Sequence, residues 1–345
     1  MLLLETTGLK PLTITSKKMK KNSRIYVAGH TGLVGVALMK ELSKTGHTDV
    51  ITRTHNELDL TNQLAVQAFF AKEKPEFVFL AAAKVGGIFA NSNYPAEFIH
   101  ENLAIQTNVI HEAWKNGVKR LLFLGSSCIY PKDCPQPIRE EYLLTGPLEP
   151  TNRPYAVAKI AGIEMCWSYN RQYGTKFLAV MPTNLYGPED NFDLETSHVL
   201  PALIRKMHEA KLQKESRVLV WGTGNPRREF LYSDDMAGAC LFLMSLDENK
   251  YENLFSDFLP PLVNIGYGED LTIAELAEMI ATVIGFKGDI RFDKTKPDGT
   301  PRKFLDCSIL RSMNWVPKIN LKDGIRFSYD ALLKIYEKLP EKNIC

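Results

Sequence analysis

The sequence predicts an α/β fold, a Rossmann-type doubly wound parallel sheet with a smaller C-terminal α/β lobe. A glycine-rich turn, Gly29–Gly35, follows an apolar segment near the start, and short apolar runs then alternate with helical patterns. Four consecutive large apolar residues, Leu121–Leu124, fit a parallel strand covered on both faces. Beyond residue 186 this alternation weakens, which predicts a second, smaller lobe there.

The composition is that of an ordinary water-soluble protein. Of 345 residues, 45% are hydrophobic and 24% are charged, and the formal net charge is +2, with basic and acidic residues interspersed. This balance gives no reason to expect a nucleic-acid partner. No uninterrupted apolar stretch of about 18 residues occurs, so we expect no membrane span. The six cysteines are scattered without CxxC pairs, which predicts reduced thiols in a cytoplasmic protein and no metal site.

The first elements are typical of a dinucleotide-binding fold. Met1–Leu4 is followed at once by Glu5 with no positive region before it, so this start is a poor signal peptide. Residues 24–28 read as a strand and residues 36–44 as a helix, with the spacing GxxGxxG between them. Such glycines permit a tight turn and close approach of backbone N–H groups to a pyrophosphate at the helix N-terminus.

A second strand, residues 49–52, ends in a basic segment. An NAD enzyme usually places an acidic residue here for the ribose 2′-hydroxyl, whereas Arg53 and His55 suit the 2′-phosphate of NADP. The alternative is that Arg53 is a solvated surface charge. Asp59 either caps the next helix or meets the adenine, and the sequence slightly favours the cap.

The strand at Leu121–Leu124 ends in small, reactive side chains. In open α/β sheets, ligands bind beyond the carboxyl ends of such strands. Ser126 and Cys128 are two residues apart, so they point the same way if the strand geometry continues. An earlier strand over residues 77–83 and a helix over residues 95–116 complete this part of the pattern.

A helix is expected from Asn152, as its cap, to Gly174. Tyr155 and Lys159 are four residues apart and share a helix face. An ammonium beside a phenol favours the phenolate form. A lone YxxxK is common on solvated faces, but its combination with the glycine turn and Ser126 points to a reductase site.

The second lobe carries fewer regular elements. After a strand over residues 176–181, a helix returns to the first lobe from Tyr232, and residues 263–266 and 272–284 complete the smaller lobe. The cationic and aromatic cluster at residues 225–230 suits a phosphorylated substrate or, alternatively, forms a solvated charged face.

With the segments GHTGLVG, SSCIYP, PYAVAK, MPTNLYGP, WGTGNPRREF and KPDGTPRK in order, the chain resembles the GDP-L-fucose synthase family of the extended short-chain dehydrogenase/reductases. The resemblance runs from about Arg24 to the region of Trp315. It implies an NADPH-dependent 3,5-epimerase and 4-reductase that acts on GDP-4-keto-6-deoxy-D-mannose in nucleotide-sugar biosynthesis. A homodimer built on two helices per subunit is likewise implied.

The resemblance also implies roles for single residues. Ser126, Tyr155 and Lys159 match the family's reductive triad, and Cys128 and His198 match its epimerising acid/base pair. Lys206, Trp221, Arg228, Asp298 and Lys303 match the groups that hold the GDP-sugar. The positions that match the NADP lining are Gly29, His30, Thr31, Gly32, Leu33, Val34, Gly35, Leu124, Gly125, Ser126, Ser127, Lys159, Pro182, Thr183, Asn184, Leu185 and His198. Thr31 and His55 replace arginines found in some members, and Lys206 stands where an arginine can occur.

The chemistry of this reaction explains these residue types. A C4 ketone acidifies the hydrogens on C3 and C5, so a thiol group at Cys128 and an imidazole at His198 can remove and return protons there. Rival readings are a 4-epimerase, a 4,6-dehydratase, a GDP-keto-heptose reductase and a noncatalytic NADP-binding sensor. A dehydratase typically has an acidic residue after its active-site serine or threonine. This chain has Cys128 after Ser126, and the stretch contains no Asp or Glu.

The expected domain organisation follows from these assignments. Residues 1–22 form a flexible N-terminal extension, and residues 23–185 form the NADP-binding Rossmann domain with a return segment at about 230–250. Residues 186–229 and 251–345 form the substrate-binding lobe.

Overall fold

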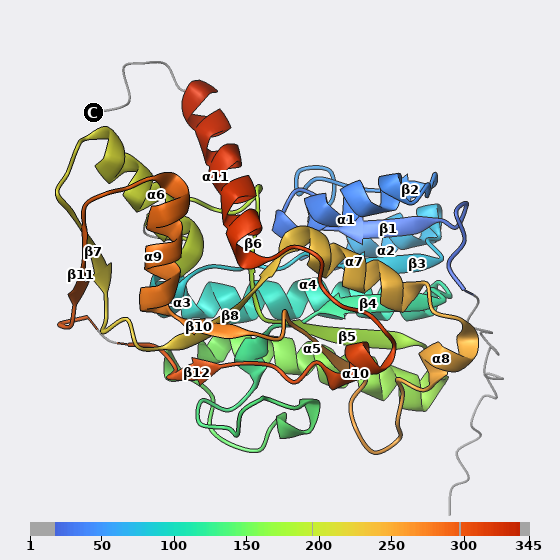
Figure 1. The fold of residues 1–345 in the computed structure, drawn as a ribbon. Coiled ribbons are helices and arrows are strands. Elements are labelled where there is room, and N and C mark those ends of the chain that lie inside the picture. Colours follow the sequence, from blue (N-terminus) through green and yellow to red (C-terminus); the bar gives the residue numbers. More distant parts are fainter. Residues whose placement is uncertain (1–17, 195, 297, 339–345) are drawn as a thin grey trace, which may run out of the picture.

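A six-stranded parallel sheet forms the centre of the first lobe (Figure 1). The computed structural model describes residues 18–194, 196–296 and 298–338. In spatial order the strands are β2 (Val50–Ile51), β1 (Ile25–Ala28), β3 (Phe77–Leu80), β4 (Arg120–Leu124), β5 (Phe177–Pro182) and β9 (Leu262–Ile265). The order reverses between β1 and β3, and the turn after β1 therefore opens at the point where such sheets bind ligands. The predicted Rossmann-type sheet is confirmed.

Alternation along the strands divides the first lobe into two cores. Ile25 and Val27 of β1 join one core, which packs under α1 (Leu33–Lys44) and α7 (Ser233–Met244). Tyr26 and Ala28 face the other core. That second core is covered by α2 (Gln63–Glu73), α4 (Pro95–Lys115) and α5 (Arg153–Tyr173). Because successive side chains point to opposite faces, apolar residues at every position bury both sides of the strand.

The second lobe has two small sheets and a core of its own. Strand β8 (Arg227–Tyr232) pairs with β6 (Asn184–Tyr186), β10 (Asp270–Thr272) and β12 (Arg302–Lys303), and β7 (Arg217–Trp221) pairs with β11 (Asp289–Asp293). Three helices supply most of the remaining apolar contacts, α6 (Val199–Leu212), α9 (Ile273–Ile284) and α11 (Leu321–Lys338). Short elements complete the described chain: α3 (Ile88–Asn93), η1 (Ser127–Ile129), η2 (Glu140–Tyr142), η3 (Pro150–Asn152), α8 (Glu248–Glu252) and α10 (Ser308–Ser312).

Two expectations about the boundaries need correction. Residues 263–266 do not complete the smaller lobe, because β9 pairs with β5 and adds a sixth strand to the central sheet. The expected flexible extension lies outside the described residues up to residue 17, but Met19 is buried in the core beneath α1. The packed part of the chain therefore begins before residue 23.

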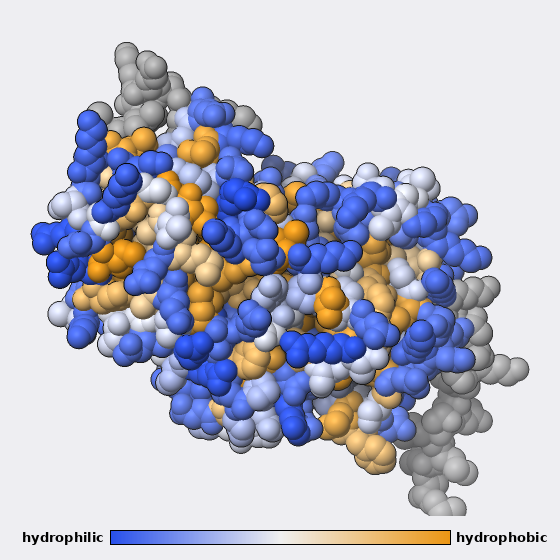
Figure 2. Space-filling model, viewed as in Figure 1, coloured by the Kyte–Doolittle hydropathy of each residue, from blue (hydrophilic) through white to orange (hydrophobic). Residues whose placement is uncertain are grey.

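The surface is mainly hydrophilic on the face shown in Figure 2. A small hydrophobic area at its lower edge lies where the loop after α8 projects, and Phe258 in that loop is 88% exposed. Within the described ranges, no helix has the length and apolar character needed to cross a membrane.

Candidate active site

The end of β4 carries the first two reactive side chains. The strand stops at Leu124, and η1 follows with Ser126 as its cap, whose hydroxyl accepts a hydrogen bond from the Cys128 N–H at 3.3 Å. The strand geometry that would align Ser126 with Cys128 therefore does not continue past Leu124. A tight turn brings both side chains close to Tyr155 instead.

Helix α5 adds Tyr155 and Lys159 to the same site. Tyr155 shares a hydrogen bond with Ser126, and the Lys159 ammonium donates to the Leu124 carbonyl at 2.8 Å. The Lys159 Nζ lies 5.8 Å from the centre of the Tyr155 ring. These contacts place both α5 residues against the end of β4.

Burial controls the protonation of this pair. It raises the pKa of Tyr155, the nearby Cys128 adds to the rise, and the Ser126 hydrogen bond opposes it. Burial also lowers the pKa of Lys159 to about 7. The expected phenolate is therefore not favoured in the protein alone, because loss of hydration outweighs the attraction of a lysine that itself tends to become neutral.

Three polar groups surround the Cys128 sulfur. The Asn152 amide donates to it at 3.1 Å, and the Lys303 Nζ lies 3.8 Å away. Burial lowers the pKa of Arg228, while the proximity of Cys128 and Asp298 opposes that fall. The sulfur thus lies where the second lobe meets the end of β4.

Asn152 is a site residue whose role the sequence does not reveal. It occupies the N-cap position of α5, as predicted, but its side chain makes no capping hydrogen bond. It turns toward Cys128 instead. The only sequence signal is its place three residues before Tyr155, which a capping role explains equally well.

His198 stands at the N-terminus of α6. Its side chain is open to solvent, yet the surrounding protein and then the Lys303 charge lower its pKa. A neutral imidazole is the form that accepts a proton. Lys303 therefore lies near both predicted acid/base residues, since its Nζ is also 3.8 Å from the Cys128 sulfur.

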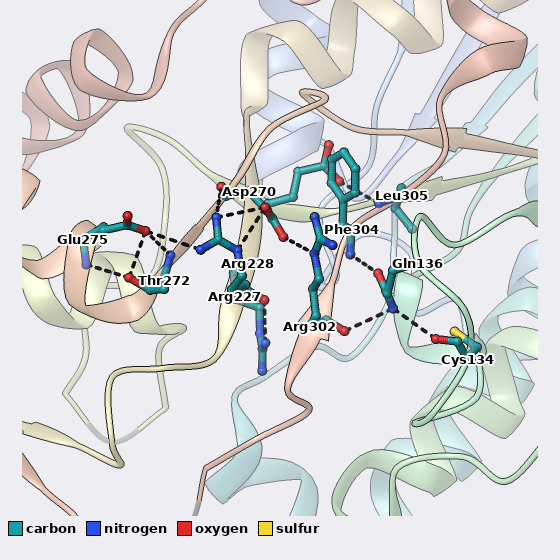
Figure 3. A network of polar contacts seen from close by, with 11 residues as sticks. Cys134, Gln136, Arg227, Arg228, Asp270, Thr272, Glu275, Arg302, Phe304 and Leu305 are labelled. Atoms are coloured by element: carbon teal, nitrogen blue, oxygen red, sulfur yellow. Dashed lines mark hydrogen bonds and ion pairs between the residues drawn. The ribbon is translucent and has the colours of Figure 1, made fainter.

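A polar network holds β12, and with it Lys303, against β8 (Figure 3). The Asp270 carboxylate accepts hydrogen bonds from the Arg227 Nη2 at 3.1 Å and from the Arg302 Nε at 2.5 Å. On the other side, Gln136 accepts from the Phe304 N–H and donates to the Arg302 carbonyl. The Arg228 side chain points away from Asp270 in this view, and its guanidinium donates to the Arg227 carbonyl at 2.8 Å.

The other predicted GDP-sugar residues come from a helix, a strand and a loop of the second lobe: Lys206 lies in α6, Trp221 ends β7, and Asp298 follows β11. Asp298 accepts hydrogen bonds from the Thr223 N–H and hydroxyl at 2.9 and 2.7 Å, and these bonds lower its pKa. The Lys206 ammonium donates to the Leu219 carbonyl, and Trp221 is 65% exposed at the end of β7. An exposed indole offers a flat apolar face for stacking.

The glycine turn after β1 fits a dinucleotide. A Cβ at Gly35 would lie 1.9 Å from the Gly29 carbonyl oxygen, whereas a Cβ at Gly32 would meet only that oxygen, at 3.6 Å. Gly32 therefore borders open space in front of the first α1 amides, which lack partners within the helix. His30 adds a buried Nδ1 without a hydrogen-bond partner among the described residues. Thr31, Leu33 and Val34 complete this cradle.

The contacts of the residues that follow β2 differ in part from expectation. Arg53 donates to Glu73 at 2.6 Å and to the Thr52 carbonyl, so its charge is already paired. His55 is exposed, with its Nδ1 4.0 Å from Asp59. Asp59 does not cap α2. It accepts from Thr61, and Asn62 caps the helix because its side chain reaches the Ala65 N–H.

Two further predicted cofactor residues are fixed at the junction between β5 and β6. The Thr183 hydroxyl and the Asn184 amide both donate to the Glu229 carbonyl, at 3.0 and 2.8 Å. Pro182 ends β5 and Leu185 lies in β6. In the part of the chain that the structure describes, no cluster of His, Cys, Asp and Glu could hold a metal ion.

The chain is similar to known proteins in sequence and in structure. Residues 25–266 match the NAD dependent epimerase/dehydratase family. Putative GDP-L-fucose synthase 2 from Arabidopsis thaliana is 57% identical over 92% of this chain and 93% of its own length. GDP-L-fucose synthase from Escherichia coli is 52% identical over 90% and 97%. Among solved structures, the NADP-bound GDP-mannoheptose C4 reductase MlghC from Campylobacter jejuni is 43% identical, with a TM-score of 0.84 over 91% and 99% of the two chains.

Proposed function

The chain belongs to the NAD dependent epimerase/dehydratase family, and on this basis we propose that it converts GDP-4-keto-6-deoxy-D-mannose to GDP-L-fucose. The reaction is a 3,5-epimerisation followed by an NADPH-dependent 4-reduction. The observation that carries this proposal is Cys128, placed beside Ser126 and Tyr155 at the end of β4. A reductase needs only the serine, tyrosine and lysine, whereas a thiol group beside them supplies a proton-transfer group for carbon.

NADP(H) is the cofactor, and when bound it supplies the hydride. The Gly29–Gly35 turn and the first turn of α1 would hold its pyrophosphate, and Lys159 would hold the nicotinamide ribose. Pairing with that ribose would offset the burial that now lowers the pKa of Lys159.

Epimerisation uses the two groups that lie near Lys303. In each inversion, one of Cys128 and His198 removes the hydrogen beside the ketone, and the other returns a proton to the opposite face. The enolate oxygen that forms between these steps accepts hydrogen bonds from Ser126 and Tyr155.

Reduction follows at the same carbonyl. C4 accepts the hydride while its oxygen takes the phenolic proton of Tyr155, so the ketone becomes an alcohol. A raised pKa keeps Tyr155 protonated and ready to donate until that step. Ser126 holds the tyrosine by their hydrogen bond.

The second lobe would bind the GDP-sugar. Arg228 offers a guanidinium with two-pronged geometry for the pyrophosphate, and Trp221 offers a stacking face. Lys206, Asp298 and Lys303 complete this set. The proposed division into an NADP-binding and a substrate-binding lobe then places the reacting sugar at their junction.

A homodimer in the cytoplasm completes the proposal. Helices α4 and α5 carry an aromatic cluster of partly exposed residues, in which the Trp114 and Tyr173 rings stack 4.2 Å apart. His111 and Tyr169 extend it. A second copy of these two helices is the partner we propose for this face. Free thiols at the described cysteines fit a reducing compartment.

One second candidate is favoured by a specific observation. The similar Campylobacter jejuni protein is described as a GDP-mannoheptose C4 reductase, so a GDP-heptose is the alternative substrate. The higher identity to proteins named GDP-L-fucose synthase favours the hexose.

The proposal is tested by incubating the enzyme with GDP-4-keto-6-deoxy-D-mannose and NADPH in deuterated water, followed by NMR. We expect NADPH oxidation together with deuterium at C3 and C5. Oxidation without deuterium would contradict the epimerase assignment. Turnover of a GDP-4-keto-heptose alone would favour the second candidate.

A further inference from the structure

Asn152 has an unusual hydrogen-bond partner for a helix N-cap residue. It precedes α5, yet its side chain makes no capping hydrogen bond, and its Nδ2 donates to the Cys128 sulfur at 3.1 Å. Its Oδ1 is buried and has no hydrogen-bond partner among the described residues. The side chain therefore satisfies the cysteine and leaves the helix end without the usual acceptor.

This arrangement is unfavourable for stability. A side-chain N-cap stabilises a helix, and a buried acceptor without a donor destabilises the fold. Local rules are broken in this way mainly at functional sites. The other Asn, Asp and Thr N-caps of the described α-helices, Asn62, Asp247 and Thr272, make the expected bonds, so among them only Asn152 departs.

The contact has a defined effect on sulfur chemistry. A thiolate accepts hydrogen bonds strongly and a thiol only weakly, so an N–H donor favours the charged form. The Lys303 ammonium, 3.8 Å from the same sulfur, acts in the same direction. The amide also occupies one side of the sulfur, which directs the proton-accepting side away from Asn152.

We propose that Asn152 is a positioning residue for epimerisation, which holds the Cys128 sulfur and favours its thiolate form for proton removal beside the C4 ketone. The inference rests on the proposed function for its substrate, but the contact itself is testable without any ligand. Asn152 acts through Cys128, so the hydride-transfer step does not depend on it.

The informative variant is Asn152→Asp. Asp has nearly the same shape and is an equally good N-cap, so a purely structural role predicts wild-type behaviour. It has no N–H donor, and its carboxylate disfavours a neighbouring thiolate. If the Asn152 Oδ1 instead accepted a hydrogen bond from a protonated Cys128 thiol, the carboxylate of Asp could accept the same bond. Asn152→Asp would then behave like the wild type. Asn152→Ala removes both atoms, and Asn62→Asp at the start of α2 is the matched control.

The first measurement uses the ligand-free enzyme. Iodoacetamide labelling of the Cys128 peptide is followed by mass spectrometry across pH. We expect about a tenfold slower rate near neutral pH in Asn152→Ala and a greater loss in Asn152→Asp, because a hydrogen bond to a charged group is stronger than one to a neutral group. Asn62→Asp should label like the wild type. Wild-type labelling of Asn152→Asp would overturn the proposal.

The second measurement separates the two half-reactions. Deuterium exchange at C3 and C5 is measured with NADP⁺ in place of NADPH, and hydride transfer is measured in reverse, as oxidation of GDP-L-fucose by NADP⁺. Exchange should fall in Asn152→Asp while reverse oxidation stays unchanged. Equal loss of both would show a structural role and overturn the proposal. A wild-type enzyme that exchanges no deuterium would contradict the proposed function, and the labelling rates would still test the contact.

Discussion

The Lys303 ammonium lies 3.8 Å from the Cys128 sulfur, although 175 positions separate the two residues in the chain. The contact depends on β12, which pairs with β8 so that Lys303 stands beside Arg228. The same positive charge lowers the pKa of His198. One lysine thus lies near both groups to which we assign proton transfer.

We therefore predict that Lys303→Gln raises the pKa of His198 toward its ordinary value, because one of the two causes of its lowering is removed. Desolvation by the surrounding protein would remain as the other cause. The measurement is NMR titration of ¹³C-labelled histidine, with His198→Gln to assign the signal. Lys294→Gln, on the exposed surface, is the control and should leave the titration unchanged. An unaltered midpoint in Lys303→Gln would refute the electrostatic link.

Cys128→Ser should suppress deuterium exchange at C3 and C5 by about 100-fold or more, since a hydroxyl is a far weaker acid and base catalyst than a thiol group. NADP binding, measured by calorimetry, should persist. Cys134→Ser is the matched control, because Cys134 is also a partly buried free cysteine in the segment after β4. Parallel loss of exchange and cofactor binding would mean that Cys128 has a structural role.

The buried Lys159 predicts how stability changes with pH. In the unfolded chain this lysine binds its proton below about pH 10.5, but in the folded protein only below about 7. Between these values the unfolded state binds more protons, so this residue makes stability rise with pH. Lys159→Met lacks that contribution. Urea unfolding without ligand should therefore show the wild type gaining on the variant between pH 7 and pH 9. A constant difference would contradict the burial effect.

Two helical glycines give a paired test of the cofactor turn. A Cβ at Gly35 would lie 1.9 Å from the Gly29 carbonyl oxygen, so Gly35→Ala should destabilise the protein by about 1–3 kcal/mol and weaken NADP binding. Gly238 in α7 has no atom within 4 Å of such a Cβ, and Gly238→Ala should stabilise by up to about 1 kcal/mol. Thermal unfolding checks both. Equal effects would show that packing at Gly35 is not limiting.

Sequence reasoning predicts most of the first lobe because its signals are local. The glycine turn lies between a strand and a helix, and the YxxxK spacing fixes one helix face, so the structure agrees with both. The apolar runs likewise predict the central strands, although strand β3 ends at Leu80, short of residue 83.

The errors arise where distant segments decide between equally good local choices. Asn152 can cap a helix, but Cys128 is the partner it takes. Asp59 is an exception, because the residue that caps α2 in its place, Asn62, lies in the same local segment. Arg53 stands at the expected edge, yet Glu73, 20 residues later, binds its charge. Residues 263–266 are a short strand that fits either lobe, and only the pairing of β9 with β5 assigns it.

The position of β9 has a consequence for how the enzyme unfolds. The chain completes five strands of the central sheet, builds part of the second lobe, returns for α7 and β9, and leaves again for β10, α9 and β11. A fragment ending at residue 185 would lack both α7 and β9, and would expose the apolar surface under α1 to water. Neither lobe is therefore a separable folding unit, and we expect heat or urea to melt both in one cooperative transition. A chain of this kind therefore cannot duplicate or exchange its substrate lobe by simple end-to-end fusion.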